Sequence, residues 1–313
     1  MPDSKSMPSH HGPHGSAGGH ENDTMRLLLE RASVRDFQSR EIPEDVFNDI
    51  MRAAAHAPTG GNLQPYSIVV VREQATKDRL TEMCGGQRFV SRAPVDLVFC
   101  IDYHRLERWA RLEGAPFSAC DAFMSFWVAF QDTIIAAQNV CTAADALGLG
   151  SVYVGSIMSS FTEIREMLDM PEGVFPVVLL SLGYPKKRPE PRRKLPPSVF
   201  VHEGRYTELP DDELRAVFDA KYNHAEIEAA TDRVATLEKV MTRVHGEDAA
   251  AEMLVGIGER GFITMAQRYF GLHYRADLMP IFNESALKAL KDAGFKCCEP
   301  YEYEWELDDS EVA

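Results

Sequence analysis

Two arginines near the start of the sequence have the spacing to hold a phosphate group. Arg31 and Arg35 lie four residues apart, with Ser33 between them. Two guanidinium groups can bind one phosphate through charge-assisted hydrogen bonds. The same pattern also suits a solvated helix end with ion pairs, so it indicates a phosphate site only in combination with other segments.

A second group of cations lies far along the chain. Six lysines and arginines fall between residues 186 and 194, among them Arg192 and Lys194. Most basic runs are solvated surface. This chain is acidic as a whole, however, and a local excess of positive charge can attract an anionic ligand. The basic loop is therefore a second candidate for phosphate contacts.

Amide side chains follow a pair of glycines in the segment Ala57–Pro65, which contains Gly60, Gly61, Asn62 and Gln64. Glycines let a backbone approach a ligand closely. Asn and Gln amides carry donors and acceptors, which match the N3–H and flanking carbonyls of a flavin pyrimidine ring. The same residues would also make an ordinary turn between a helix and a strand, and this segment alone does not separate the two interpretations.

A glycine-rich segment, Gly148–Ser156, ends a long predicted helix and starts a predicted strand. Gly148 and Gly150 suit the C-terminal end of a helix. Gly155 and Ser156 can present backbone N–H groups to a ring, although a glycine pair means little by itself.

The four segments are more specific together than singly. They spread over about 160 residues and offer cations at both ends, with amides and small residues between them. A flavin mononucleotide (FMN) needs these parts, because its phosphate requires charge and its ring edge requires hydrogen bonds. The sequence has no Walker, HExxH or GxSxG motif, and the glycines of residues 12–19 follow no strand. The combination predicts one FMN site.

Hydrophobic spacing predicts the elements that position these segments. Pro43 is typical of the first position of a helix, and residues 77–84 resemble a short helix. Buried strands are predicted at four apolar runs, residues 67–71, 95–102, 152–154 and 175–183. Helices and buried strands interleave without a regular βαβ repeat, so an α+β sheet layered between helices fits best.

The longest predicted helix covers residues 118–147 and would span roughly 45 Å. It is apolar over more than one stripe, so it lies either in the centre of the core or against a partner subunit. An edge strand is predicted at residues 198–202, and several helical pieces at residues 211–294. Residues 299–313 are acidic, and within them the segment from Tyr301 to Leu307 alternates apolar side chains with glutamates, which indicates a strand at a sheet edge, with an acidic tail as the alternative.

Composition excludes some classes of function. The 313 residues carry a net charge of −15, which disfavours general nucleic-acid binding. The sequence contains no run of 18 apolar residues, so no membrane span is predicted. The first 23 residues, with four histidines, are expected to be a disordered tail, with a metal-binding tract or a residual expression tag as alternatives. Six cysteines without a CxxC pair indicate free thiols in a reducing cytoplasm.

Taken together, these segments resemble the FMN-dependent nitroreductase family, and within it the branch of oxygen-insensitive nitroreductases and NADPH-flavin oxidoreductases. The similarity runs from Met25 to Leu209. Within this range it includes four further short motifs, Gln87–Val90, Gln138–Asn139, Gly183–Pro185 and His202–Tyr206.

The resemblance implies a nitroreductase-like fold, with an antiparallel-rich central sheet flanked by helices, in an intertwined homodimer with two FMN sites at the subunit interface. It also implies roles for nine residues. Arg31, Ser33 and Arg35 would bind the phosphate and ribityl end, and Arg192 and Lys194 would close on the phosphate. Gln64, with Asn62 nearby, would contact the ring or ribityl chain. Gly155 and Ser156 would face the N5 and O4 edge.

The implied activity is FMN-dependent oxidation of NADPH or NADH by ping-pong hydride transfer to a small-molecule acceptor, such as a nitroaromatic, a quinone or free flavin. No side-chain acid or base and no metal is required. The alternatives are a specialised dehalogenase or flavin-fragmenting member of the same family, or a non-enzymatic flavin-binding sensor. Met158 departs from the branch, which often has Arg there, so acceptor contacts are expected to differ.

The predicted division of the chain has three parts. Residues 1–23 form the tail, residues 24–210 form the FMN-binding domain, and residues 211–313 form a helical C-terminal extension with an acidic end. The extension contains no segment like the flavin motifs, so it is expected to shape access of the acceptor.

Overall fold

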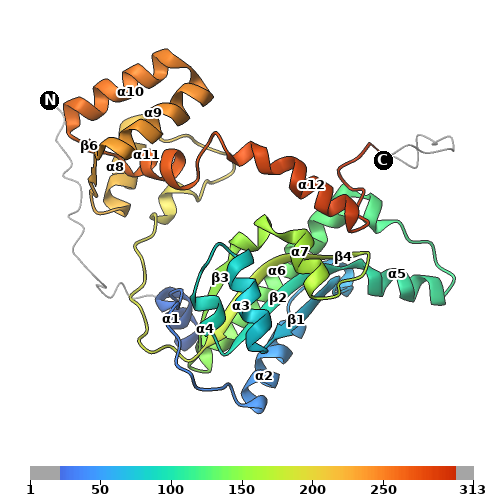
Figure 1. The fold of residues 1–313 in the computed structure, drawn as a ribbon. Helices are drawn as coiled ribbons and strands as arrows, with labels where there is room; N and C mark the ends of the chain where they lie inside the picture. Colours follow the sequence, from blue (N-terminus) through green and yellow to red (C-terminus); the bar gives the residue numbers. More distant parts are fainter. Residues whose placement is uncertain (1–21, 301–313) are drawn as a thin grey trace.

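A four-stranded antiparallel sheet is the centre of the computed structural model, which describes residues 22–300 (Figure 1). Its strands lie in the order β1 (Tyr66–Val71), β2 (Val95–Asp102), β4 (Val174–Gly183) and β3 (Gly150–Val154). Every neighbouring pair is antiparallel. The predicted α+β class with an antiparallel-rich sheet is confirmed.

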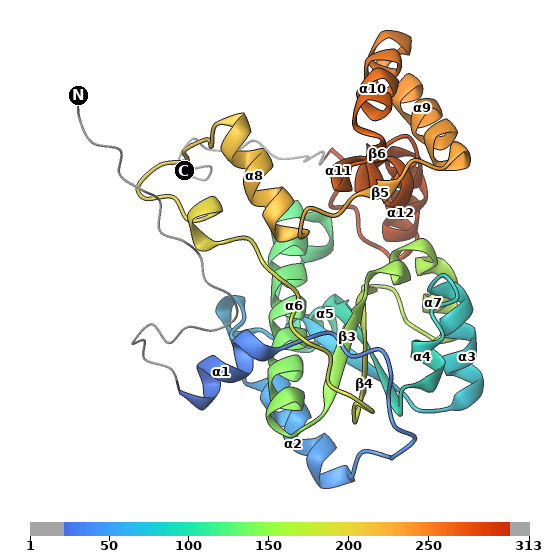
Figure 2. The ribbon, with the colours of Figure 1, turned by 90° about the vertical axis from the view of Figure 1, so that its left-hand side faces the viewer.

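The two central strands are buried along their whole length, and their side chains alternate between two layers of core. On β2, Leu97 and Phe99 face one core cluster, whereas Val98 and Cys100 face the other. Both faces are therefore covered by helices, which explains the uninterrupted apolar runs of the two strands. Figure 2 shows α6 on one side of the sheet and α3, α4 and α7 on the other.

The long helix α6 runs from Phe123 to Ala146. The predicted start at residue 118 is wrong, because Ala119–Asp121 forms a separate 3-10 turn, η2, and Ala122 is extended. The 24 residues span about 36 Å. Six large apolar side chains of α6 are exposed in the single chain, namely Phe123, Met124, Trp127, Val128, Phe130 and Ile135.

Most other predicted elements of the first 184 residues are present. Pro43 immediately precedes α2 (Glu44–Ala55), and the short helix is α3 (Gln74–Met83). The remaining elements of this part are α1 (Asp23–Glu30), η1 (Gly60–Asn62), α4 (Phe89–Arg92), α5 (Tyr103–Leu112), η3 (Gly155–Ser159) and α7 (Phe161–Met167).

The predicted edge strand at residues 198–202 is wrong. Pro197–Val199 forms a 3-10 turn, η4, and the N–H of Val199 bonds to the carbonyl of Pro196. Pro196 and Pro197 immediately precede the predicted strand and have no N–H to donate to a sheet, which favours the turn.

The predicted helical pieces after residue 211 are confirmed. They are α8 (Asp211–Lys221), α9 (Thr231–His245), α10 (Glu247–Arg260), α11 (Met265–Gln267), η5 (Arg268–His273), η6 (Met279–Ile281) and α12 (Phe282–Asp292), with a two-stranded sheet of β5 (Ile227–Glu228) and β6 (Phe262–Ile263).

The helices α9 and α10 have a small core of their own, built on Leu237, Ile257 and Ile263. The chain then returns to the sheet through α12 (Figure 1), and Ala293 and Phe295 are buried in the main core. The C-terminal part is therefore tied to the sheet at its far end.

Some predictions concern residues outside the described range. Residues 301–313 hold most of the predicted acidic strand, and residues 1–21 hold most of the predicted tail. Within residues 22–300, no helix is long and apolar enough to cross a membrane. All six cysteines are free, and four of them are buried.

Candidate functional site

The segment Arg31–Arg35 lies along the edge strand β3. The N–H of Val34 donates to the carbonyl of Ser151 at 3.0 Å. A Cβ at Gly150 would lie 2.3 Å from Val34 Cγ2, so only glycine permits this approach. The fold thus joins the segment Arg31–Arg35 to the glycine-rich segment Gly148–Ser156. Gly148, at φ +80°, fits the expected helix end, whereas Gly150 belongs to the strand and serves close packing instead.

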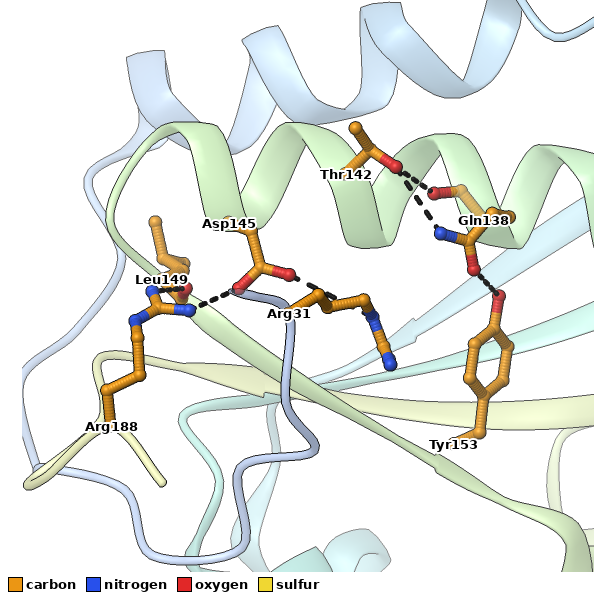
Figure 3. Close-up of polar contacts among 7 residues, drawn as sticks. All are labelled: Arg31, Gln138, Thr142, Asp145, Leu149, Tyr153 and Arg188. Carbon is orange, nitrogen blue, oxygen red and sulfur yellow. Dashed lines mark hydrogen bonds and ion pairs between the residues drawn. The ribbon is translucent and has the colours of Figure 1, made fainter. Parts of the chain in front are cut away.

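Arg31 belongs to a charged cluster at the C-terminal end of α6 (Figure 3). The Asp145 carboxylate is 3 % exposed and lies 2.6 Å from Arg188 Nη1. Arg31 Nε is 3.9 Å from the other carboxylate oxygen. Arg188 also donates to the Leu149 carbonyl at 2.7 Å. The cluster therefore holds two guanidinium groups beside one carboxylate.

Two donors of this cluster make no hydrogen bond among the described residues. Arg31 Nε and Nη2 are both buried and make no hydrogen bond. A buried guanidinium with unsatisfied donors is costly, and an anion placed beside it would satisfy them. The donor set therefore fits the phosphate that the spacing of Arg31 and Arg35 predicts.

The predicted ring-edge residues follow β3 directly. Ser156 Oγ donates to the Cys84 carbonyl at 2.8 Å and accepts from Gln87 Nε2 at 2.6 Å. Arg35 comes to the same region, since its guanidinium carbon lies 5.9 Å from the centre of the Phe89 ring. A Cβ added at Gly155 would meet no atom within 4 Å, so open space lies beside this residue. A planar ring has room to approach there.

Gln87 is a residue of this site to which the sequence assigned no role. It follows Gly85 and Gly86, both at positive φ, which end α3 and turn the chain toward Ser156. The motif Gln87–Val90 was part of the family resemblance, but only the fold shows that its amide reaches Ser156. Met158 is 63 % exposed in η3, the same turn that begins with Gly155.

A row of polar side chains continues along α6 from the charged cluster (Figure 3). The Tyr153 hydroxyl donates to Gln138 Oε1 at 3.5 Å, and Gln138 Nε2 donates to Thr142 at 3.4 Å. Burial raises the pKa of Tyr153 above its usual range, so its hydroxyl keeps its proton at neutral pH.

The other two predicted ring contacts, Asn62 and Gln64, occupy a loop with an unusual backbone. Their φ angles are 55° and 51°, in the left-handed region that residues with a Cβ rarely adopt. Each such residue costs on the order of 1 kcal/mol or more, and strain of this kind is concentrated at functional sites. Asn62 is exposed, whereas Gln64 Nε2 donates to the Ala55 carbonyl at 3.1 Å.

One chain does not bring all predicted residues together. The loop of Asn62 contacts α6 at Asp132, whereas Arg31 contacts the same helix at Asp145. The two contacts therefore lie about 20 Å apart along α6. Within residues 22–300 no hydrogen bond or ion pair joins the loop to the segment Arg31–Arg35.

Arg192 and Lys194 form a separate group. Both are exposed, and they line a cavity of about 580 Å³ together with Lys221, Tyr222 and Tyr269. They do not contact Arg31 in the described part of the chain. The structure thus places the segment Arg31–Arg35 along β3, the strand that Gly155 and Ser156 directly follow, and leaves the loop and the basic pair outside this region.

Comparison with known proteins agrees with the fold. The nitroreductase family model matches residues 28–184, and the chain belongs to this family. The predicted family is confirmed.

Two curated relatives cover most of the chain. It is 30 % identical to a Cr(VI) reductase of Pseudomonas sp. (strain G-1), over 72 % of this chain and 96 % of the relative. It is 29 % identical to an NADPH-flavin oxidoreductase of Vibrio harveyi, over 77 % and 98 % of the two chains.

Two solved structures extend the similarity to the fold. A structure from Bacteroides fragilis has a TM-score of 0.72 at 28 % identity and covers 87 % of this chain and 99 % of its own. Nitroreductase A of Vibrio parahaemolyticus has a TM-score of 0.62 at 29 % identity and covers 77 % of this chain and 98 % of its own.

Proposed function

We propose that this protein is an FMN-dependent NAD(P)H oxidoreductase that reduces small acceptors such as nitroaromatics, quinones or flavins. The observation that carries the proposal is the pair of buried donors on Arg31 that make no hydrogen bond. The same segment also carries Arg35, and there is open space at Gly155. Relatives named NADPH-flavin oxidoreductase and oxygen-insensitive NADPH nitroreductase support the same chemistry.

The residues divide the work between the two ends of the cofactor. Arg31, Ser33 and Arg35 hold the phosphate and ribityl end. Arg192 and Lys194, which make no contact with Arg31 in the described part of the chain, would close on the phosphate when FMN binds. Gly155 and Ser156 face the N5 and O4 edge of the ring. Gln87 fixes the Ser156 hydroxyl through its 2.6 Å hydrogen bond and so orients that edge.

When bound, FMN supplies the redox chemistry by accepting two electrons from NAD(P)H and passing them to the acceptor. The protein contributes orientation and electrostatics. Backbone N–H groups near Gly155 stabilise negative charge at the ring edge, and the Asp145 carboxylate keeps Arg31 and Arg188 near the phosphate end. No side-chain acid or base is assigned.

The active form that we propose is a homodimer. The exposed apolar side chains on α6, including Trp127 and Ile135, form a face that water would otherwise cover. Two copies of α6 packed antiparallel across a twofold axis would bring the loop of Asn62 and Gln64 in one copy near Arg31 of the other. This arrangement supplies the ring contacts that one chain leaves about 20 Å away.

The C-terminal part is proposed to shape access of the acceptor. Aromatic side chains of α8 and of the segment from β6 to η5, including Phe218, Tyr222, Phe262 and Tyr269, line a cavity of about 810 Å³. The choice between NADPH and NADH, the domain boundaries at residues 23 and 210, and the cytoplasmic location stay predictions.

The test of this proposal is the identity of the bound cofactor. The protein purified and reconstituted with flavin is expected to be yellow and to release FMN on denaturation. Chromatography that identifies FAD, or no flavin at all, would overturn the assignment. Steady-state oxidation of NAD(P)H then separates an enzyme from a flavin-binding sensor.

A further inference from the structure

The loop Thr59–Pro65 holds a backbone that needs outside support. Gly61, Asn62 and Gln64 have φ angles of 58°, 55° and 51°, so three of four consecutive residues are left-handed. Left-handed residues other than glycine persist only where the surrounding structure determines them strongly. The contacts of the loop show which residues provide that support.

Asp132 of α6 anchors the front of the loop. Both of its carboxylate oxygens accept from the Gly60 N–H, at 3.2 and 3.1 Å. Asp132 is buried, and a Cβ at Gly60 would lie 2.8 Å from Val128 Cγ1 on the same helix. The front of the loop therefore lies directly on α6, and glycine is required there.

Arg105, in the first turn of α5, anchors the rear. Its Nη2 donates to the Gln64 carbonyl at 2.6 Å and to the Tyr66 carbonyl at 2.9 Å. Its Nη1 donates to Ser67 Oγ at 3.3 Å and lies 3.7 Å from an oxygen of Asp102. One guanidinium thus connects the end of the loop, the start of β1 and the start of α5.

We propose that Arg105 and Asp132 are positioning residues that hold the Asn62 and Gln64 amides at the flavin ring. The inference rests on the proposed function, in which these two amides contact FMN. Neither positioning residue touches the ring; each acts through the backbone of the loop. Because Gln64 Nε2 is already bonded to the Ala55 carbonyl, its Oε1 is the atom left to accept from the flavin N3–H.

The test combines two substitutions in a double-mutant cycle. Arg105→Met keeps the length of the side chain and removes its donors, and Gln64→Ala removes the ring contact itself. Arg108→Met is the matched control, because Arg108 is an exposed arginine on the same helix. FMN affinity is measured by quenching of flavin fluorescence, and loop order by hydrogen exchange of the peptide around residues 59–66 in the FMN-free protein.

Arg105→Met is expected to speed exchange in the loop and to weaken FMN binding roughly tenfold, about as much as loss of one charge-assisted hydrogen bond. The Arg105→Met/Gln64→Ala double variant should lose less affinity than the sum of the two single losses, because both changes remove the Gln64 contact and only the Asn62 contact is left for Arg105 to hold. Arg105→Lys should recover part of the affinity, and Arg108→Met should match the wild type in both measurements.

Three results would overturn the inference. If Gln64→Ala weakens FMN binding and Arg105→Met does not, the positioning role is wrong and the proposed function stands. If the two losses add fully, Arg105 acts through another route. If Gln64→Ala itself binds FMN like the wild type, the ring contact of the proposed function is wrong, and the positioning role fails with it.

A second variant guards against misfolding of Arg105→Met. Asp132→Asn keeps the shape and one acceptor for the Gly60 N–H but removes the charge. Asp132→Asn should also speed hydrogen exchange in the loop and weaken FMN binding, although less than Arg105→Met does. Unchanged exchange and affinity in Asp132→Asn would contradict the role assigned to this residue.

Discussion

Substitution of Arg31 by Met tests the phosphate site most specifically. The change keeps an unbranched side chain of similar length and removes the guanidinium. In the FMN-free protein the Nε and Nη2 donors of Arg31 make no hydrogen bond. Removal of the guanidinium gives up its 3.9 Å ion pair with Asp145, but Arg188 still holds that carboxylate at 2.6 Å, so the fold should lose little stability. In the complex the same donors are expected to bond to the phosphate, so their removal should weaken FMN binding strongly.

The magnitude follows from the two donors. A hydrogen bond to a charged group contributes about 1.5–3 kcal/mol. The Arg31 side chain is 23 % exposed, and Arg35 would still hold the phosphate, so we take the lower end for each bond. Loss of both then weakens binding by about 3 kcal/mol, or roughly 100-fold.

The assay is titration of the FMN-free protein with FMN and, in parallel, with riboflavin, which lacks the phosphate. Arg31→Met should lose affinity for FMN and keep the wild-type affinity for riboflavin. Arg26→Met is the control, since Arg26 lies on α1 in an exposed pair with Asp23. Equal losses for FMN and riboflavin, or no loss for either, would refute the reasoning.

Three further predictions concern packing, protonation and assembly. Gly150→Ala should lower the unfolding free energy by about 1–3 kcal/mol, because its Cβ would lie 2.3 Å from Val34, whereas Gly258→Ala, a helix position with open space around it, should not destabilise; equal thermal midpoints for the two variants would contradict this. Burial raises the pKa of Asp96 to about 7, so the folded protein binds the Asp96 proton more tightly than the unfolded chain does. The folded protein therefore loses up to about 4 kcal/mol of stability as the pH rises from about 4 to about 7. Asp96→Asn should flatten this dependence of the unfolding free energy on pH, and an unchanged dependence in denaturant unfolding would count against the assignment. Trp127→Glu should convert the proposed dimer to monomers at low micromolar concentration, and a wild-type mass in light scattering would argue against the α6 interface.

The sheet could be predicted well because its central strands obey one rule. Residues 95–102 form a strand with the predicted bounds, since a strand buried on both faces leaves an uninterrupted apolar run. The start of α6 was misplaced because Ala119 and Cys120 are as compatible with a helix as with a 3-10 turn. The strand predicted at residues 198–202 failed because its β-branched and aromatic residues follow two prolines.

The site could be predicted only as far as its local spacing allowed. Arg31, Ser33 and Arg35 are close in sequence, and the fold places their segment, through Val34, beside Gly150 and Ser151. The contacts that orient the site join residues distant in sequence, such as Gln87 with Ser156. Periodicity and motifs carry no signal for such pairs, so Gln87, Asp145 and Arg105 acquire roles only from the fold.

The central claim is that this chain transfers electrons from NAD(P)H through a bound flavin. Anaerobic stopped-flow mixing of the FMN-loaded protein with NADPH, and separately with NADH, tests it most directly. At least one of the two donors should bleach the visible flavin absorbance, and a nitroaromatic or quinone added afterwards should restore it. Flavin that stays oxidised with both donors would contradict the claim and favour a flavin-binding protein without this activity.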